Sequence, residues 1–244
     1  MDEAERRSRI DLAAAFRWTA RWGLNEGVAN HFSLALTPDG QTFLMNPNGR
    51  HFSTIRASEL LRLDALDPSC LEGPGAPDIS AWSIHGAVHR SRPGARCVMH
   101  THMRYATALA AIEDGRLEYC HQNAARYWGR IAYDDHFNGL AVNDDEGQRI
   151  AGALGNKSVM FMAGHGVTVI GDSVAETFDD LYYLERACET QILAQQTGRP
   201  LYRIADDVAE TTSRQWSQDF TALASMHFAE LKRILDREEP DYAD

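Results

Sequence analysis

Two apolar strand patterns, each continued at once by a helical pattern, most constrain how this chain can fold. The first is ARCVMHTH, residues 95–102, which runs into the helical pattern MRYATALAAIEDG, residues 103–115. The second is KSVMFMAGHGVTVIG, residues 157–171, in which Gly-His-Gly separates two strands. A long amphipathic helix is predicted to follow from residue 173 to about residue 196. The chain therefore consists of alternating elements rather than separate modules.

The rest of the chain adds elements of the same kind. Residues 3–22 form a helical pattern that stops at Gly23. HFSLALTPDGQTFLMNP, residues 31–47, predicts a β-hairpin, because two short β patterns flank a Pro-Asp-Gly turn. Residues 73–80 are rich in glycine and proline and predict a loop leading into a helix at about residues 81–90. The last forty-odd residues are polar and predicted to be helical.

Composition limits the classes of partner. A chain of 244 residues with 44% hydrophobic residues can bury one sizeable core. Its formal net charge of -11 disfavours nucleic acid and anionic membranes as partners. No apolar run approaches the roughly 20 residues of a membrane span, so we expect a cytoplasmic protein. Four scattered cysteines predict neither a disulfide framework nor a thiolate metal site: Cys70, Cys97, Cys120 and Cys188.

Two histidines end the first strand pattern. Side chains two apart in a strand point to the same face, so His100 and His102 can act as a two-pronged ligand. A third imidazole could come from His165, which Gly164 and Gly166 leave uncrowded. Three histidines with an open position are typical of a catalytic metal site. The alternative is that they are hydrogen-bonded histidines of the strand or core.

A second histidine pair competes with the first. His85 and His89 lie four apart on a predicted helix, which also places two imidazoles on one face. No glutamate follows His85, so the metalloprotease pattern fails. We therefore expect this pair to lie in the core or behind the site. The spacing assigns no role to four other histidines: His31, His51, His121 and His136.

Three segments together carry a resemblance to a known family. RPGARCVMHTHMRYATALAA, FMAGHGVTVIGDSVAETFDDLYYLERACETQ and VANHFSLAL resemble the class II aldolase/adducin family over nearly all of residues 8–200. The resemblance implies an α/β fold, a three-layer αβα sandwich with a central, mostly antiparallel sheet. It implies a homotetramer with sites near subunit interfaces, and one divalent metal per subunit on His100, His102 and His165. Residues 1–200 would be the catalytic domain and 201–244 a helical extension of it.

Departures from the family's sugar-phosphate aldolases decide which member this chain resembles. Those enzymes carry a Ser-Ser-Glu-Trp segment whose glutamate is the acid/base, and its tryptophan corresponds to Trp82 here. Ala81 then takes the place of the glutamate, and a methyl group cannot transfer a proton. The serines that bind phosphate are replaced by PDIS, in which Asp78 would repel phosphate. Asp78 could approach the metal or a catalytic water, or be a solvated loop residue.

The loops that correspond to the family's substrate loops are NEGVANHFS, residues 25–33, and NPNGRHF, residues 46–52. Arg50 offers a planar fork suited to a carboxylate. These loops, with the missing glutamate, resemble the decarboxylase branch of the family. The residues implied in substrate binding are Asn30, Asn48, Gly49, Arg50 and Asp78, and the candidates for proton transfer are His51, Glu26 and His31.

The expected function is therefore that of a metal-dependent carboxy-lyase. Its substrate would be an anionic hydroxylated aromatic or pyridine dicarboxylate, such as 3-hydroxy-2-methylpyridine-4,5-dicarboxylate. The metal would act as Lewis acid and electron sink, with manganese favoured over zinc. Two alternatives stay open: an aldolase or epimerase acting on a small phosphorylated sugar, and a non-catalytic adducin-like binding module.

Overall fold

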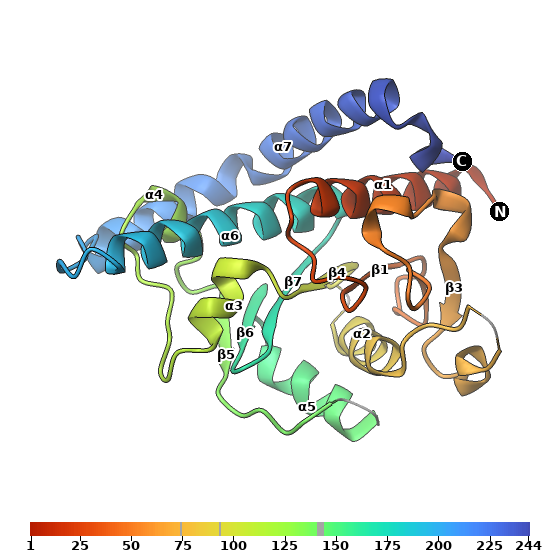
Figure 1. Ribbon diagram of the computed structural model, residues 1–244, viewed down its shortest axis with the longest axis horizontal. Helices are drawn as coiled ribbons and strands as arrows, with labels where there is room; N and C mark the ends of the chain where they lie inside the picture. The colour runs from red at the N-terminus through yellow and green to blue at the C-terminus, as the bar shows by residue number, and fades with distance from the viewer. Residues whose placement is uncertain (74, 93, 141–143) are drawn as a thin grey trace.

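A single seven-stranded sheet forms the centre of the molecule (Figure 1). The computed structural model describes the whole chain except residues 74, 93 and 141–143. The strands lie in the order β3-β2-β1-β4-β7-β6-β5, and every neighbouring pair is antiparallel except β5 and β6. Their bounds are β1 His31–Ala35, β2 Thr42–Met45, β3 Leu61–Asp64, β4 Cys97–Thr101, β5 Ile131–Asp134, β6 Val159–Met162 and β7 Gly166–Gly171. The expected α/β fold with a mostly antiparallel sheet is confirmed.

Helices cover both faces of this sheet. Helices α1, α6 and α7 run along one side in Figure 1, while α2 and α5 lie on the other. The α-helices of the described chain are α1 Glu3–Arg21, α2 Ile79–Ser91, α3 Arg104–Ala110, α4 Gln122–Ala125, α5 Asp144–Leu154, α6 Val174–Gln195 and α7 Asp206–Glu238. The three layers of the expected sandwich are thus present.

The alternation of side chains along the strands divides the core between the two faces. In β4, Cys97 and Met99 join the large cluster with α1, α3, α6 and α7. Val98 points the other way and packs with the apolar side chains of α2 and α5. Because side chains alternate along a strand, His100 shares the face of Val98. The first histidine of the pair therefore faces the α2 and α5 layer.

Most expected elements form where the pattern predicted them. The hairpin around Pro38–Gly40 is confirmed, because β1 and β2 pair antiparallel with Ser33 opposite Met45. The strand at β5 and the helices α4 and α5 were not predicted. β5 is only four residues long and joins β6 in parallel, and so short a run carries little period-two signal.

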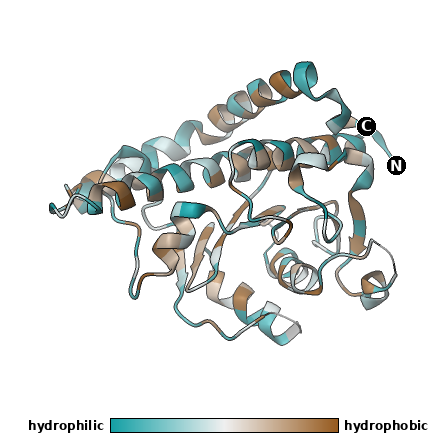
Figure 2. Cartoon of the chain, in the orientation of Figure 1, coloured by the Kyte–Doolittle hydropathy of each residue, from teal (hydrophilic) through white to brown (hydrophobic). Residues whose placement is uncertain are grey.

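The C-terminal segment is a 33-residue helix, α7. Figure 2 shows hydrophobic and hydrophilic bands along it, as expected of a helix with one buried side. Phe228, Leu231 and Leu235 pack into the same cluster as α1 and α6. Among the described residues, no helix carries an apolar stretch long enough to cross a bilayer.

Candidate metal centre and active site

Three imidazoles converge where β4 and β7 meet. His100 ends the apolar run of β4, and His102 follows that strand directly. His165 stands in the turn that joins β6 to β7, the neighbour of β4 in the sheet. The Nε2 atoms of His100 and His102 lie 3.1 Å apart, and one ligand atom from each of the three histidines falls within 4.8 Å of the others. The structure thus brings together the three residues that the spacing predicted.

Two glycines make this approach possible. Gly164 has a φ of +62°, a conformation that L side chains seldom adopt. At Gly166 an added Cβ would lie 2.6 Å from the Thr101 carbonyl oxygen and 2.7 Å from Cδ2 of His102. A side chain there would push the His102 ring out of place. The Gly-His-Gly pattern is therefore a steric requirement of the site.

The outer ring nitrogens of the first two histidines are already engaged. His102 Nδ1 lies 2.5 Å from Oε2 of Glu26, and a carboxylate oxygen can only accept. His100 Nδ1 lies 3.3 Å from Oγ1 of Thr168, whose hydroxyl lies 3.6 Å from the sulfur of Met162 as a donor. These outer contacts turn Nε2 of both rings towards each other and towards the third imidazole. Metal-bound histidines are commonly held in this way, with the outer nitrogen on a carboxylate or another oxygen, so these residues fit a divalent metal.

Two of the three imidazoles, those of His100 and His165, have lowered pKa values. Burial, reinforced by the neighbouring histidines, lowers the pKa of His100 well below its usual value. Burial and the charge of His102 lower the pKa of His165 to about 4. Neutral imidazoles are the form that binds metals, so lowered pKa values favour metal binding by His100 and His165.

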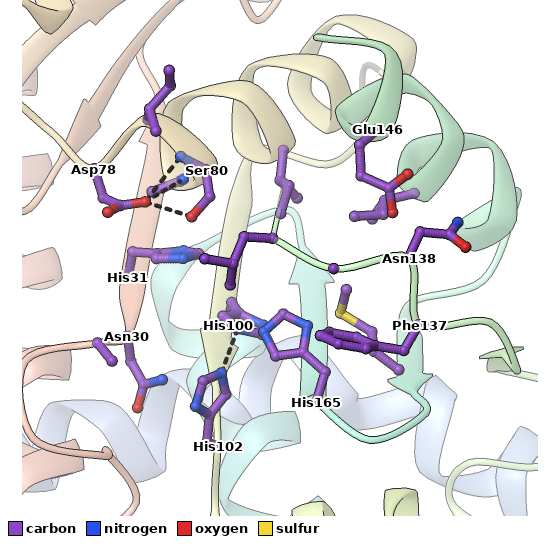
Figure 3. Close-up of a pocket in the computed structure, with 18 of the residues that line it drawn as sticks. Asn30, His31, Asp78, Ser80, His100, His102, Phe137, Asn138, Glu146 and His165 are labelled. Carbon is purple, nitrogen blue, oxygen red and sulfur yellow. Dashed lines mark hydrogen bonds between the residues drawn. The ribbon is translucent and has the colours of Figure 1, made fainter. Parts of the chain in front are cut away.

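A cavity of about 290 Å³ opens beside the three histidines (Figure 3). Its volume is close to the lower end of the range for small-ligand pockets, about 300 Å³, which suits a single-ring acid. Its walls come from the segment before β1, the start of α2, and the segment between β5 and α5. In Figure 3, Asp78 and His31 lie on one side of the three imidazoles, and Phe137 and Asn138 lie on the other.

Some of the predicted substrate and proton-transfer residues line this cavity. They are Asn30, His31, Asn48 and Asp78. The side-chain nitrogen of Asn30 is buried and has no partner among the described residues, while Asn30 Oδ1 accepts from the backbone of Glu26 at 2.6 Å. Glu26 does not line the cavity; through its carboxylate it holds the outer nitrogen of His102.

Other predicted residues are not brought to the cavity. Gly49, Arg50 and His51 are exposed, and none of them lines it. The guanidinium of Arg50 pairs with Glu59, whose other oxygen accepts from the backbone of Arg56, and this holds Arg50 over a separate surface hollow. Within one chain, Arg50 therefore lies outside the cavity, and its role in binding a substrate carboxylate stays a prediction.

The segment after β5 supplies cavity residues that the sequence reasoning missed. Arg149 lines the cavity and holds Asp134 with two hydrogen bonds of 2.9 and 2.8 Å, and also holds Glu146. The hydrogen bond from Arg149 lowers the pKa of Glu146. His136, Phe137 and Asn138 complete this wall. The acid-rich runs YDDH and NDDEG were the available signal, but β5 itself was not recognised.

The start of α2 carries the most telling departure. Ala81, which is 1% exposed, lines the cavity at the position where the aldolases of the family are expected to carry their glutamate. Asp78 caps this helix by accepting from the backbone of Ser80 and Ala81 at 2.9 and 3.3 Å. Although burial opposes ionisation, these hydrogen bonds lower the pKa of Asp78. An anion thus already occupies this helix N-terminus.

Comparisons with known proteins agree with this geometry. The class II aldolase and adducin N-terminal domain matches residues 10–192. The chain is 31% identical to the decarboxylase NovR of Streptomyces niveus, over 95% of this chain and 84% of that protein. It is 29% identical to a 4-hydroxy-3-prenylphenylpyruvate oxygenase/4-hydroxy-3-prenylbenzoate synthase of Streptomyces roseochromogenus, over 83% and 73% of the two chains. The crystal structure of an aldolase II superfamily protein from Pseudomonas syringae superposes with a TM-score of 0.90 at 33% identity, covering 100% of this chain and 98% of that one.

Proposed function

This chain belongs to the class II aldolase and adducin family, and we propose that it is a divalent-metal-dependent decarboxylase of a hydroxylated aromatic or pyridine carboxylic acid. The observation that carries the proposal is Ala81. The wall that should present the aldolases' proton-transferring glutamate carries a methyl group, while three converging imidazoles remain beside it. Aldol cleavage loses its acid/base, but the three histidines that would hold an electron-accepting metal are retained.

Decarboxylation needs only a group that stabilises the electron pair left on the ring, and a proton. The bond between the ring carbon and the carboxylate breaks, carbon dioxide leaves, and the electron pair stays on the ring carbon until a proton arrives. When bound by the three histidines, one divalent metal per subunit, for which we favour manganese over zinc, supplies Lewis-acid stabilisation of that electron pair. The buried amide nitrogen of Asn30 can donate to a substrate oxygen.

The three candidates for proton transfer take different places in the proposal. Glu26 holds the outer nitrogen of His102 and orients it, and a contact of this kind tunes a ligand rather than the substrate. His51 lies outside the cavity. His31 lines the cavity, so it is the candidate of the three that can touch a substrate.

The substrate class follows from the charges and from the relatives. Arg149 is the one arginine among the described residues lining the cavity, and it is engaged by Asp134 and Glu146. The second carboxylate of a dicarboxylate would therefore lack a cation of its own within one chain, so we propose a hydroxylated monocarboxylate, or a dicarboxylate whose second group meets a neighbouring subunit. The relative named for a 4-hydroxyphenylpyruvate derivative acts on a hydroxylated aromatic acid. A homotetramer remains part of the proposal.

An aldolase or epimerase for a phosphorylated sugar is the second candidate, which the family name favours. It needs a phosphate site, and Asp78 already occupies the amides at the start of α2 that could form one. A non-catalytic adducin-like module would have no use for three converging histidines.

Metal analysis combined with a substrate screen tests the proposal. Purified protein with manganese or zinc is offered hydroxybenzoates, hydroxypyridine carboxylates and their dicarboxylates, with release of carbon dioxide as the signal, and phosphorylated sugars in parallel. His100→Ala, His102→Ala and His165→Ala should lose both metal and turnover. His121→Ala, a histidine outside the cavity, should keep both. Full metal occupancy in His165→Ala, or cleavage of the sugar phosphates alone, would overturn the proposal.

A further inference from the structure

A buried chain of hydrogen bonds leads away from the cavity beneath α2. His31 and Ser33 lie on the same face of β1, and His85 and His89 of α2 contact them on that face. His31 Nδ1 lies 2.8 Å from His85 Nε2, and Ser33 Oγ bridges His85 Nδ1 at 2.5 Å and His89 Nε2 at 2.7 Å. His89 Nδ1 ends the chain 2.6 Å from the carbonyl oxygen of Ala95. All four side chains are buried.

The last contact sets the direction of every other one. A carbonyl oxygen can only accept, so His89 Nδ1 carries the hydrogen. Burial lowers the pKa of His89 to about 4, so its Nε2 is bare and the Ser33 hydroxyl must donate to it. Ser33 has one hydrogen, so it accepts from His85 Nδ1.

The same reasoning reaches the cavity. Burial lowers the pKa of His85 well below its usual value, which leaves His85 Nε2 as an acceptor for the N–H on His31 Nδ1. The single ring hydrogen of a neutral His31 then lies on the inner nitrogen Nδ1, where it meets His85 Nε2 at 2.8 Å, and the outer nitrogen Nε2 keeps a lone pair. The carbonyl oxygen of Ala95, four hydrogen bonds away, thus determines which nitrogen of His31 can accept.

His31 is beside the metal ligands without being one of them. It lies opposite His100 across β1 and β4, with the two rings stacked at 4.9 Å. Among the described residues the ligand group contains only His100, His102 and His165. Nε2 of His31 has no hydrogen-bond partner in the described part of the chain, and His31 lines the cavity together with Asp78. This wall therefore offers acceptors, a bare imidazole nitrogen and a carboxylate, and no donor from either group.

We propose that Ser33, His85 and His89 are positioning residues that fix His31 as a hydrogen-bond acceptor, and that the substrate presents a donor to His31 Nε2. A ring hydroxyl that keeps its hydrogen, or a protonated ring nitrogen, can donate a hydrogen bond to His31 Nε2. A carboxylate, an ether or a halogen has no hydrogen to donate. The direction of the chain stands on its own contacts, whereas the ring substrate rests on the proposed function.

The direction can be read in the unmodified protein. Nitrogen-15 NMR of histidine rings distinguishes a nitrogen that carries hydrogen from one that does not, and the spectrum is recorded on the metal-free protein, which has ten histidines, at pH 7. His31→Gln assigns the signal of interest by its absence. We expect hydrogen on Nδ1 and none on Nε2 of His31. Hydrogen on Nε2 would overturn the proposal whatever reaction the protein catalyses.

Ser33→Ala tests the positioning role. Without the bridging hydroxyl, His85 can move its hydrogen to Nε2, and His31 then becomes a donor towards the cavity. The matched control is Thr107→Ala, which removes a buried hydroxyl that has no partner among the described residues and lies on α3. The Ser33→Ala spectrum should gain a His31 signal with hydrogen on Nε2, and the control should keep the original spectrum.

Binding supplies the second readout. The probes are 2-hydroxybenzoates that carry either a hydroxyl or a methoxy group at ring position 3, 4 or 5, titrated into the manganese-loaded protein. In the pair that reaches His31, the wild type should prefer hydroxyl over methoxy roughly 10- to 100-fold, and Ser33→Ala should lose most of that preference. The same preference in wild type and Ser33→Ala for all three pairs would refute the substrate part. If the NMR and binding results are as expected but no carbon dioxide is released from any substrate offered, only the proposed function is refuted.

Discussion

Replacing Glu26 by alanine should weaken metal binding about tenfold without removing any metal ligand. Glu26 accepts from Nδ1 of His102 at 2.5 Å, so its carboxylate both orients the ring and increases the electron density at Nε2. Outer partners of metal-bound histidines typically contribute 10- to 100-fold in affinity. The Glu26 side chain is 67% exposed, so water screens its charge and the effect should lie near the lower end of that range.

Two replacements separate orientation from charge. Glu26→Gln keeps an acceptor for the His102 N–H but removes the charge, so metal affinity should fall only a few-fold. Glu26→Ala removes both and should cost about 1.4 kcal/mol, the equivalent of the tenfold loss. A competition titration against a chelating indicator measures both values.

Glu59→Ala is the matched control. It also removes one carboxylate and changes the net charge equally, but Glu59 pairs with Arg50 outside the cavity. Its metal affinity should equal that of the wild type. Equal weakening in Glu26→Ala and Glu59→Ala would mean that only the net charge matters, and unchanged affinity in Glu26→Ala would refute the orienting role outright.

Further predictions concern the glycine, the turn and the buried histidines. Gly166→Ala should destabilise the fold by about 1–3 kcal/mol and weaken metal binding, because the added carbon would meet His102 and the Thr101 carbonyl. Gly152→Ala is the control and should do neither, because no atom lies within 4 Å of its added carbon. Equal urea midpoints for the two variants would contradict this. Arg50→Ala should change kcat/KM less than about twofold and the free energy of unfolding by less than about 1 kcal/mol, because the ion pair with Glu59 is partly exposed. A loss of 30-fold or more in kcat/KM, roughly equal to 2 kcal/mol, would place Arg50 in the site of a neighbouring subunit. The free energy of unfolding of the metal-free protein should fall by roughly 2 kcal/mol between pH 7 and pH 5 through His89 alone. Its folded pKa of about 4 lies below the usual 6.5, so the unfolded chain takes up the proton first and the stability present above 6.5 is lost as the pH falls towards 4. Urea titrations at pH 7 and pH 5 should show a smaller fall in the free energy of unfolding for His89→Gln than for the wild type. Equal falls in the two proteins would refute the assignment of this pH dependence to His89.

Local patterns were enough to predict the three converging histidines. Two histidines at i and i+2 at the end of a strand must share a face, whatever the rest of the chain does. The glycines around His165 likewise signalled a close approach that the structure requires at Gly166. The hairpin was equally local, because its turn residues lie between its two strands.

The wider site depended on contacts between distant segments. Arg50 and Asn48 belong to one turn, yet Asn48 lines the cavity while Arg50 turns outward to Glu59, a partner nine residues away. Asp134 and Arg149 come from a strand too short to be recognised and from the helix after it. No periodicity reports on such pairs, because they are set by how elements pack.

The sequence by itself determined which side chains could bind a metal, since that follows from the two-residue repeat of a strand and the small size of glycine. Only the tertiary structure decided the hydrogen-bond direction at His31. That direction depends on β1 lying beside β4 and on α2 packing across both, which brings His31 to His85 across 54 positions of the sequence. A hydrogen bond needs its two atoms within about 3 Å, and only the packed arrangement of strand and helix provides that.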